Sequence, residues 1–163
     1  MKWKRVLIFI LVIILLSIIS IYYPILNENI KNNKIEYPPE KSYVVRIIDG
    51  DTIETSAGVI RFLGINTPEK GENYSQEATD FLKQIEYQEI NLVRDFEDLD
   101  KYKRKLRYVV YNDRILNIEI AEKGLGKAYM TNDLIYTDKI INAQIFAQEN
   151  CLGLWKQELE GCR

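Results

Sequence analysis

The chain has 163 residues, which is enough for one domain of ordinary size. It contains no histidine, and this excludes Ser-His-Asp triads, Cys-His pairs and imidazole-bound zinc. Its formal net charge of −2 gives no general nucleic-acid-binding signature, so any phosphate binding must come from local basic groups. An enzyme of this composition has to work with carboxylates, arginines, lysines or tyrosines.

Residues 1–23 predict a membrane anchor. Three basic residues within positions 1–5 precede an uncharged apolar run from Val6 to Ile21, and two tyrosines follow it. The run is at the short end of the range of about 20 residues that crosses a bilayer. No small-x-small cleavage site follows, and the basic end should stay in the cytoplasm. We favour an uncleaved signal anchor with an extracytoplasmic domain. The alternative is cleavage of this segment, and cleavage would make the protein secreted.

Residues 24–41 predict a linker, and residues 42–163 a folded domain. The linker is polar, lacks apolar periodicity and contains Pro38-Pro39. The chain has two cysteines, Cys151 and Cys162, both near its C-terminus. In an exported domain they could form a disulfide that ties the tail to the last helix. Two free thiols are the alternative.

The pattern of the domain predicts an α+β fold. Val44–Ile48 and Thr52–Thr55 are expected strands, joined by a tight turn in which Gly50 can take a positive φ. Val59–Ile65 is the third expected strand. Further along we expect a helix capped by Ser75, strands at Glu89–Arg94 and Arg107–Tyr111, a helix capped by Asn117 that stops at Gly124, an extended piece at Lys127–Tyr129, and a helix at Thr137–Asn150. Five strands and three helices in this order match an OB-type barrel.

Oxygen-bearing side chains surround the first turn and the end of the third strand. The candidate ligands of a metal ion are Asp49, Asp51, Asn66 and the Thr67 carbonyl, with Glu69 nearby. Calcium takes six to eight oxygen ligands of these kinds, so the cluster suits a hard cation. The alternative is an ordinary turn in which each Asp bonds its own backbone.

Basic residues in two regions are candidates for binding phosphate. Arg61 lies in a strand with apolar residues on both faces, so its guanidinium should be enclosed and needs an anion, either a protein carboxylate or a substrate phosphate. Arg104, with Lys101 and Tyr102, could hold phosphates as well, although a solvated charged loop is the alternative. Glu69 is the candidate general base, or else a surface acid.

Together these segments resemble the thermonuclease, or staphylococcal-nuclease-like, family. The matching blocks are DGDT from Asp49, IRFLGINTPE from Ile60, DKYKR from Asp100, and LNIEIAEKGLGKAY from Leu116. They come in the family's order and cover about residues 43–156. The resemblance implies an OB-fold barrel with three helices. It also implies calcium-dependent hydrolysis of DNA and RNA that leaves a 5′-hydroxyl and a 3′-phosphate.

The resemblance also assigns roles to single residues. It places Arg61, Glu69 and Arg104 as catalytic residues, Asp51 and Asp49 as a calcium ligand and its acidic companion, the Thr67 carbonyl as a further ligand, Lys101 and Tyr102 on the terminal phosphate, and Tyr129 near a nucleotide-contacting tyrosine. Asn66 departs from the family, where an aspartate ligand is usual. Because calcium affinity depends on ligand charge, weaker binding of the single ion is expected. Lys103 replaces a usual glycine, and the loop after Glu69 is short.

These observations predict a calcium-dependent nuclease tethered to the outer side of the membrane. Tyrosines that stack on splayed bases favour single-stranded DNA or RNA as the substrate. We infer no obligate protein partner. The alternative is a catalytically silent module on the same fold that binds nucleic acid or a protein, but the retained arginines and glutamate favour the enzyme. A glycosidase with paired carboxylates would leave both arginines without a role.

Overall fold

The computed structural model describes residues 3, 12–13, 15–20, 22–23, 38–129, 134–158 and 160–162. The chain divides into two compact units, Met1–Glu36 and Tyr37–Arg163. The described residues between 12 and 23 are helical. Within the described part of the chain, none of the helices has the length and apolar character needed to traverse a membrane. Most of the predicted anchor and linker lies outside the described residues, so both stay predictions.

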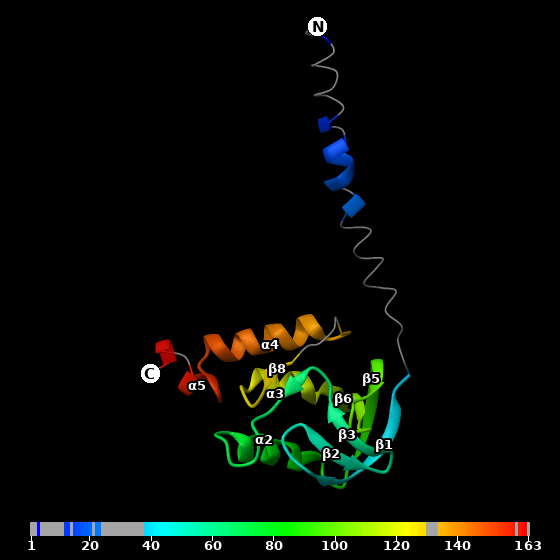
Figure 1. Ribbon diagram of the computed structural model, residues 1–163, viewed down its shortest axis with the longest axis vertical. Coiled ribbons are helices and arrows are strands. Elements are labelled where there is room, and N and C mark those ends of the chain that lie inside the picture. The colour runs from blue at the N-terminus through cyan, green and yellow to red at the C-terminus, as the bar shows by residue number, and fades with distance from the viewer. Residues whose placement is uncertain are drawn as a thin grey trace. The chain divides into compact units, whose positions relative to one another are not determined.

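Five strands of the second unit form a closed ring (Figure 1). They are β1 (Glu40–Ile47), β2 (Thr52–Thr55), β3 (Gly58–Phe62), β5 (Glu89–Leu99) and β6 (Lys105–Tyr111). Neighbours are antiparallel in the order β3-β2-β1-β5-β6, and a parallel pairing of β3 with β6 closes the barrel. This arrangement confirms the predicted OB-type barrel.

Short strands and helices complete the unit. β4 (Ile65–Asn66) pairs with β8 (Lys127–Ala128), and β7 (Arg114–Ile115) pairs with β6. The helices are α2 (Ser75–Leu82), α3 (Leu116–Glu122), α4 (Thr137–Glu149) and α5 (Trp155–Glu158), with 3₁₀ turns η1 (Lys83–Ile85) and η2 (Glu160–Cys162). Figure 1 shows α4 running alongside α3. Fully buried side chains of the barrel, α2, α3 and α4 form one core, including Phe62, Leu82, Tyr108, Ile120 and Ile140.

Two predicted helix caps are wrong. Ser75 is the first residue of α2, and Tyr74 holds the cap position with φ 66° and no capping side-chain bond. Asn117 lies within α3 and is fully buried. Its Oδ1 accepts a hydrogen bond from the Val109 N–H at 2.9 Å, and its Nδ2 donates to the Leu63 carbonyl at 2.9 Å. A buried amide can pair with a donor and an acceptor at once, so Asn117 joins β6 to the chain that follows β3.

The expected positive φ at Gly50 is also wrong, and a different constraint requires glycine there. Gly50 is absent from the glycines with positive φ. A Cβ at this position would lie 2.6 Å from the Ala78 Cβ and 2.7 Å from the Thr67 Oγ1. The turn between β1 and β2 therefore packs directly against α2 and Thr67. The third strand is shorter than expected and ends at Phe62, because Gly64 takes φ 72° and turns the chain into β4.

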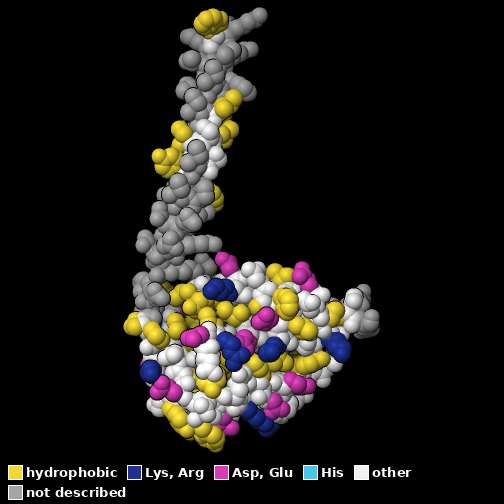
Figure 2. Space-filling model, turned by 180° about the vertical axis from the view of Figure 1, so that it is seen from behind, with side chains coloured by type: hydrophobic (Ala, Val, Ile, Leu, Met, Phe, Trp, Pro, Cys, Tyr) yellow, Lys and Arg dark blue, Asp and Glu magenta, His cyan; other side chains and the backbone are white. Residues whose placement is uncertain are grey.

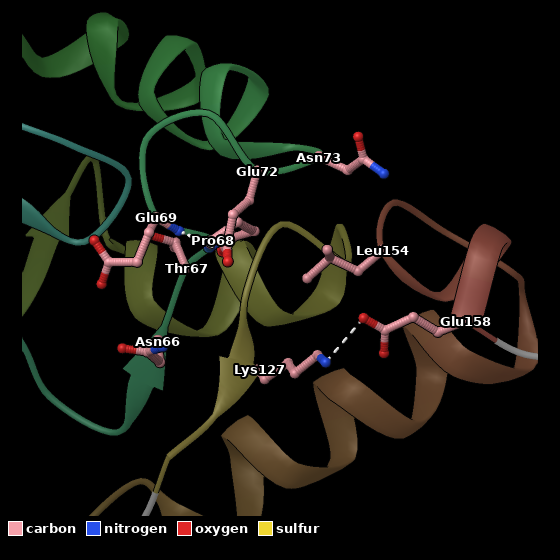
Figure 3. Close-up of a pocket in the computed structure, with 9 residues that line it drawn as sticks. All are labelled: Asn66, Thr67, Pro68, Glu69, Glu72, Asn73, Lys127, Leu154 and Glu158. Atoms are coloured by element: carbon pink, nitrogen blue, oxygen red, sulfur yellow. Dashed lines mark hydrogen bonds and ion pairs between the residues drawn. The ribbon is translucent and has the colours of Figure 1, made fainter.

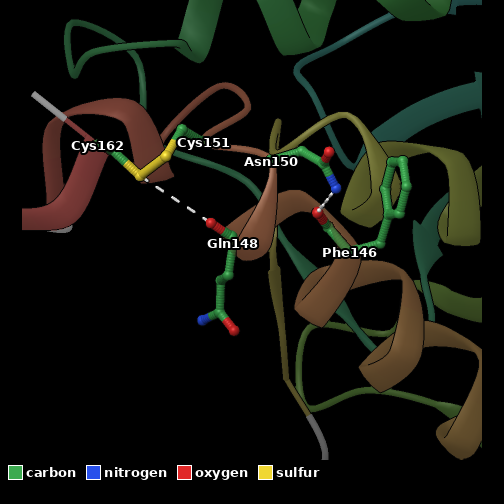
Figure 4. The surroundings of a disulfide bond; sticks show 5 residues. All are labelled: Phe146, Gln148, Asn150, Cys151 and Cys162. Atoms are coloured by element: carbon green, nitrogen blue, oxygen red, sulfur yellow. Dashed lines mark hydrogen bonds between the residues drawn. A yellow bond between two sulfur atoms is a disulfide. The ribbon is translucent and has the colours of Figure 1, made fainter.

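The two cysteines form a disulfide near the end of the chain (Figure 4). Cys151 follows α4, and Cys162 belongs to η2, with their Cα atoms 5.4 Å apart. The bond closes a loop that contains α5. This cross-link anchors the C-terminal segment to the end of α4.

Candidate active site

Arg61 is held in place by four acceptors. Its Nη1 donates to the carbonyls of Phe62 at 3.0 Å and Ile65 at 2.8 Å. Its Nη2 donates to the Asn66 Oδ1 at 2.7 Å and forms an ion pair with the Asp51 Oδ2 at 3.0 Å. Burial lowers the pKa of Arg61, and the charge of Asp51 opposes that effect. Of the two partners that the sequence left open, a protein carboxylate is the one present.

Asp51 is the centre of this network and is only 6% exposed. Its Oδ2 accepts from the Thr67 N–H at 2.8 Å, and its Oδ1 accepts from the Thr52 Oγ1 at 3.1 Å. Burial raises the pKa of Asp51, while Arg61 and the Thr67 N–H lower it. Asp49 lies beside it, because the Asp51 N–H donates to the Asp49 Oδ1 at 3.0 Å.

Arg104 enters the site from the turn between β5 and β6. Asp100 shapes this turn by accepting from the N–H groups of Tyr102 and Arg104, each at 2.9 Å, and from the Arg104 Nε at 2.7 Å. Burial would raise the pKa of Asp100, but these hydrogen bonds hold it below its ordinary value. Arg104 Nη1 reaches the Thr52 Oγ1 at 3.5 Å, which links the second arginine to Asp51 through one hydroxyl.

A cavity of about 750 Å³ joins most of the predicted substrate-binding residues. Its lining includes the six predicted residues Arg61, Asn66, Lys101, Tyr102, Arg104 and Tyr129. The Tyr102 ring lies under two cations, with the Lys101 Nζ at 4.9 Å and the Arg104 guanidinium at 5.4 Å from its centroid. Tyr102 and Tyr129 are both exposed, although the two cations lie over the Tyr102 ring. On the face shown in Figure 2, basic side chains are scattered among acidic ones and form no continuous basic patch.

Glu69 is not among the residues that line this cavity. It lines a neighbouring cavity of about 470 Å³, which shares Asn66 with the first. Glu69 is exposed, and its N–H donates to the Glu72 Oε2 at 2.8 Å. In Figure 3 its carboxylate points away from Lys127 and Glu158 on the far wall. The Glu69 carboxylate is therefore open to solvent, but it lines a different cavity from the two arginines.

The candidate metal ligands are of the chemical type that binds a hard cation, but only two of the four are negatively charged. Asp49 and Asp51 supply two carboxylates, and Asn66 and Thr67 supply an amide oxygen and a backbone carbonyl. All are oxygen donors, as calcium requires, and water can complete the coordination. Among the described residues no group of three or more His, Cys, Asp or Glu is arranged to hold a metal. The Arg61 guanidinium already contacts two of these oxygens, so a bound cation would have to share them.

A closed OB barrel that carries two arginines, a lysine and tyrosines around one cavity defines a class of phosphate- and nucleic-acid-binding proteins. Comparison with known families makes this more specific. Residues 59–157 match the family described as staphylococcal nuclease homologue, and the chain belongs to that family.

Two thermonucleases are similar to almost the whole chain. The thermonuclease of Staphylococcus intermedius is 31% identical over 160 residues, covering 89% of this chain and 95% of the relative. That of Staphylococcus hyicus is 30% identical over 159 residues, covering 90% of this chain and 94% of the relative. An uncharacterized endonuclease of Haemophilus influenzae is 32% identical over 120 residues, covering 69% of this chain and 64% of the relative. This kinship supports a nuclease function.

Sequence reasoning missed two residues that organise the site. Thr52 is buried and bridges Asp51 and Arg104, and Asp100 holds the turn that carries three predicted site residues. Both lie inside the motif blocks that were recognised. The signal for Asp100 was present, since an Asp two residues before Tyr102 can bond the turn's own backbone. The role of Thr52 depends on a contact between residues 52 positions apart.

Lys103 takes φ 67° in this same turn, where a glycine would be less strained. We expect Lys103→Gly to raise the free energy of unfolding by about 0.5–1 kcal/mol, since relief of left-handed strain outweighs the added chain entropy of glycine. Urea denaturation of the full-length protein measures the change. Lys70→Gly, at an exposed position without positive φ, is the matched control and should not stabilise. An unchanged or lower midpoint for Lys103→Gly would contradict this account.

Proposed function

We propose that the protein is a calcium-dependent nuclease that hydrolyses phosphodiester bonds in single-stranded DNA or RNA. The observation that carries the proposal is the convergence of Arg61 and Arg104 on one cavity, with the exposed Glu69 in a neighbouring cavity that shares Asn66 with it. Membership of the staphylococcal nuclease family supports it. A silent binding module would need neither the glutamate nor the paired arginines, so their joint presence favours the enzyme.

The proposed reaction is attack of water on phosphorus. Glu69 accepts a proton from the water as its oxygen forms a bond to phosphorus, and the ester P–O bond on the opposite side breaks. Arg61 and Arg104 donate hydrogen bonds to the phosphate oxygens and offset the charge that builds up on the five-coordinate phosphorus. The departing alkoxide takes a proton from solvent. Tyr102 and Tyr129 stack on the neighbouring bases, which requires unpaired substrate.

Asp49, Asp51, Asn66 and the Thr67 carbonyl are the residues that would hold calcium. When bound, the ion supplies positive charge that polarises the phosphate. The chain's own contribution is to orient Asp51 through Thr67 and Thr52, whose hydrogen bonds oppose the rise in the pKa of Asp51 that burial causes. Only two of the four ligands are charged, which supports weak calcium binding.

Glu69→Gln tests the proposed base. We expect kcat on single-stranded DNA to fall by at least about 100-fold, because glutamine cannot take the proton from water. Arg104→Ala should cause a similar loss, and excess chelator should abolish cleavage by the unaltered protein. Glu122→Gln, an exposed glutamate on α3 outside both cavities, is the matched control. Full activity of Glu69→Gln combined with Arg104→Ala, or in chelator, would refute the nuclease mechanism.

Asn66→Asp tests the proposed ligand set. The substitution adds a third carboxylate to those of Asp49 and Asp51. It should lower the calcium concentration for half-maximal cleavage several-fold, since calcium affinity rises with ligand charge. The measurement is a calcium titration of the initial rate for both proteins, with magnesium in parallel. Identical calcium dependence of the two proteins would remove Asn66 from the ligand set.

We also propose that residues 1–23 anchor the protein in a membrane, with the nuclease domain outside the cytoplasm. The basic start and the apolar run from Val6 support this, and the paired cysteines suit an oxidising compartment. In cells that express the full chain, the protein should sediment with membranes, resist extraction by carbonate and be digested by protease added outside. Recovery in the soluble cytoplasmic fraction would contradict the proposal, and release of a shortened chain would indicate cleavage.

A further inference from the structure

Within the described part of the C-terminal segment, buried side chains end at Trp155. Leu154 and Trp155 are buried, whereas residues 156–158 of α5 are exposed. A chain end without buried contacts frays unless something ties it down. The tie is the disulfide, which joins Cys162 back to Cys151 just after α4 (Figure 4).

Two exposed contacts connect this segment to the chain around Glu69. The Asn73 Nδ2 donates to the Gln157 Oε1 at 2.9 Å. The Lys127 Nζ forms an ion pair with the Glu158 Oε1 at 2.9 Å (Figure 3). Exposed contacts of this kind add little stability on their own, because the cost of ordering both side chains offsets the attraction. They persist when the chain that carries them is already held, and the disulfide holds it.

The first contact leads to Glu69 through one tight turn. The Glu72 N–H donates to the Glu69 carbonyl at 2.9 Å, and the Glu69 N–H donates to the Glu72 Oε2 at 2.8 Å. Asn73 is the next residue, so its bond to Gln157 fixes the end of this turn against α5. The candidate base is thereby connected to α5 by a short series of hydrogen bonds.

The second contact leads to the neighbour of Arg61. Lys127 pairs with Asn66 in the β4–β8 sheet, and the Asn66 Oδ1 accepts from the Arg61 Nη2 at 2.7 Å. Both contacts therefore end on the segment from Asn66 to Asn73. Because α5 lies inside the loop that the disulfide closes, the state of one covalent bond bears on both of them.

We propose that the Cys151–Cys162 disulfide is a redox-sensitive clamp on the segment from Asn66 to Asn73. When the bond is formed, α5 holds this segment in place. When the bond is reduced, the end of α5 frays and the turn after Glu69 loosens, while the barrel stays folded because its core does not depend on the disulfide. The effect on catalysis rests on the proposed nuclease function: a loosened turn places Glu69 correctly for a smaller share of the time.

The reductant is a dithiol. One of its thiolates attacks a cysteine sulfur, the S–S bond breaks, and a mixed disulfide forms. The second thiol of the reductant then displaces the other cysteine. Two electrons and two protons pass to Cys151 and Cys162, which become thiols, and the dithiol becomes a disulfide. Both cysteines are only partly buried, as such an attack requires.

Hydrogen exchange of the full-length protein, followed by mass spectrometry with and without dithiothreitol, tests the clamp without an activity assay. On reduction we expect exchange to accelerate about ten-fold or more in peptides that cover residues 69–75 and 156–162, whereas peptides from β6 keep their protection. Cys151→Ser combined with Cys162→Ser should exchange like the reduced protein and should not respond to dithiothreitol. Reduction should also lower kcat on single-stranded DNA by roughly three- to ten-fold.

Gln157→Ala combined with Glu158→Ala separates the clamp from a general loss of stability. In this variant reduction should accelerate exchange at residues 156–162 but not at 69–75, because the two contacts that transmit the change are gone. Lys156→Ala, at an exposed position of the same helix, is the matched control and should keep the full response to dithiothreitol.

Unchanged exchange at residues 69–75 on reduction, or a response there that survives in the Gln157→Ala and Glu158→Ala variant, would overturn the clamp while the nuclease function stands. Equal kcat in both redox states, with exchange at 69–75 accelerated, would overturn its effect on catalysis. No cleavage by the oxidised protein would refute the nuclease function, and the exchange measurements would still decide for or against the clamp.

Discussion

The buried carboxylate of Asp51 is the constraint on which the candidate site depends. A buried charge is costly unless it is paired, and Asp51 is satisfied by Arg61, Thr67 and Thr52 together. These partners come from β2, β3 and the end of β4, so the pairing requires β2 and β3 to lie in the observed register. The same contacts orient the arginine proposed to be catalytic and the proposed ligands of calcium. The network that stabilises the buried charge is thus also the scaffold of the site.

Motif recognition predicted the barrel and the family correctly, because those features are encoded in short segments. The structure places Arg61, Arg104, Lys101 and Tyr102 around one cavity, although Arg61 and Arg104 are 43 positions apart in sequence. Two of the errors have a common cause. Gly50 and Asn117 were interpreted as local turn and cap residues, but a neighbour distant in sequence determines each. Ala78 leaves no space for a side chain at Gly50, and Val109 donates a hydrogen bond to Asn117.

Asn66 makes several contacts in the structure besides its proposed role as a metal ligand. Its Oδ1 accepts from Arg61, its backbone pairs with Lys127 in the short β4–β8 sheet, and its side chain borders both cavities. An aspartate here would add charge for calcium but would also pair more strongly with Arg61. An amide leaves the guanidinium with one carboxylate partner, Asp51. Asparagine or aspartate at position 66 would therefore change how strongly Arg61 and a bound cation compete for the same oxygens.

The C-terminal segment extends this argument beyond the barrel. Asn73 joins the short loop after Glu69 to Gln157 on α5. α5 lies within the loop closed by Cys151 and Cys162, so the covalent cross-link limits how far this wall can move. A disulfide of this kind is stable only in an oxidising compartment, which is where the predicted anchor would place the domain. The proposed export and the shape of the cavity beside Glu69 would thereby be linked through one bond.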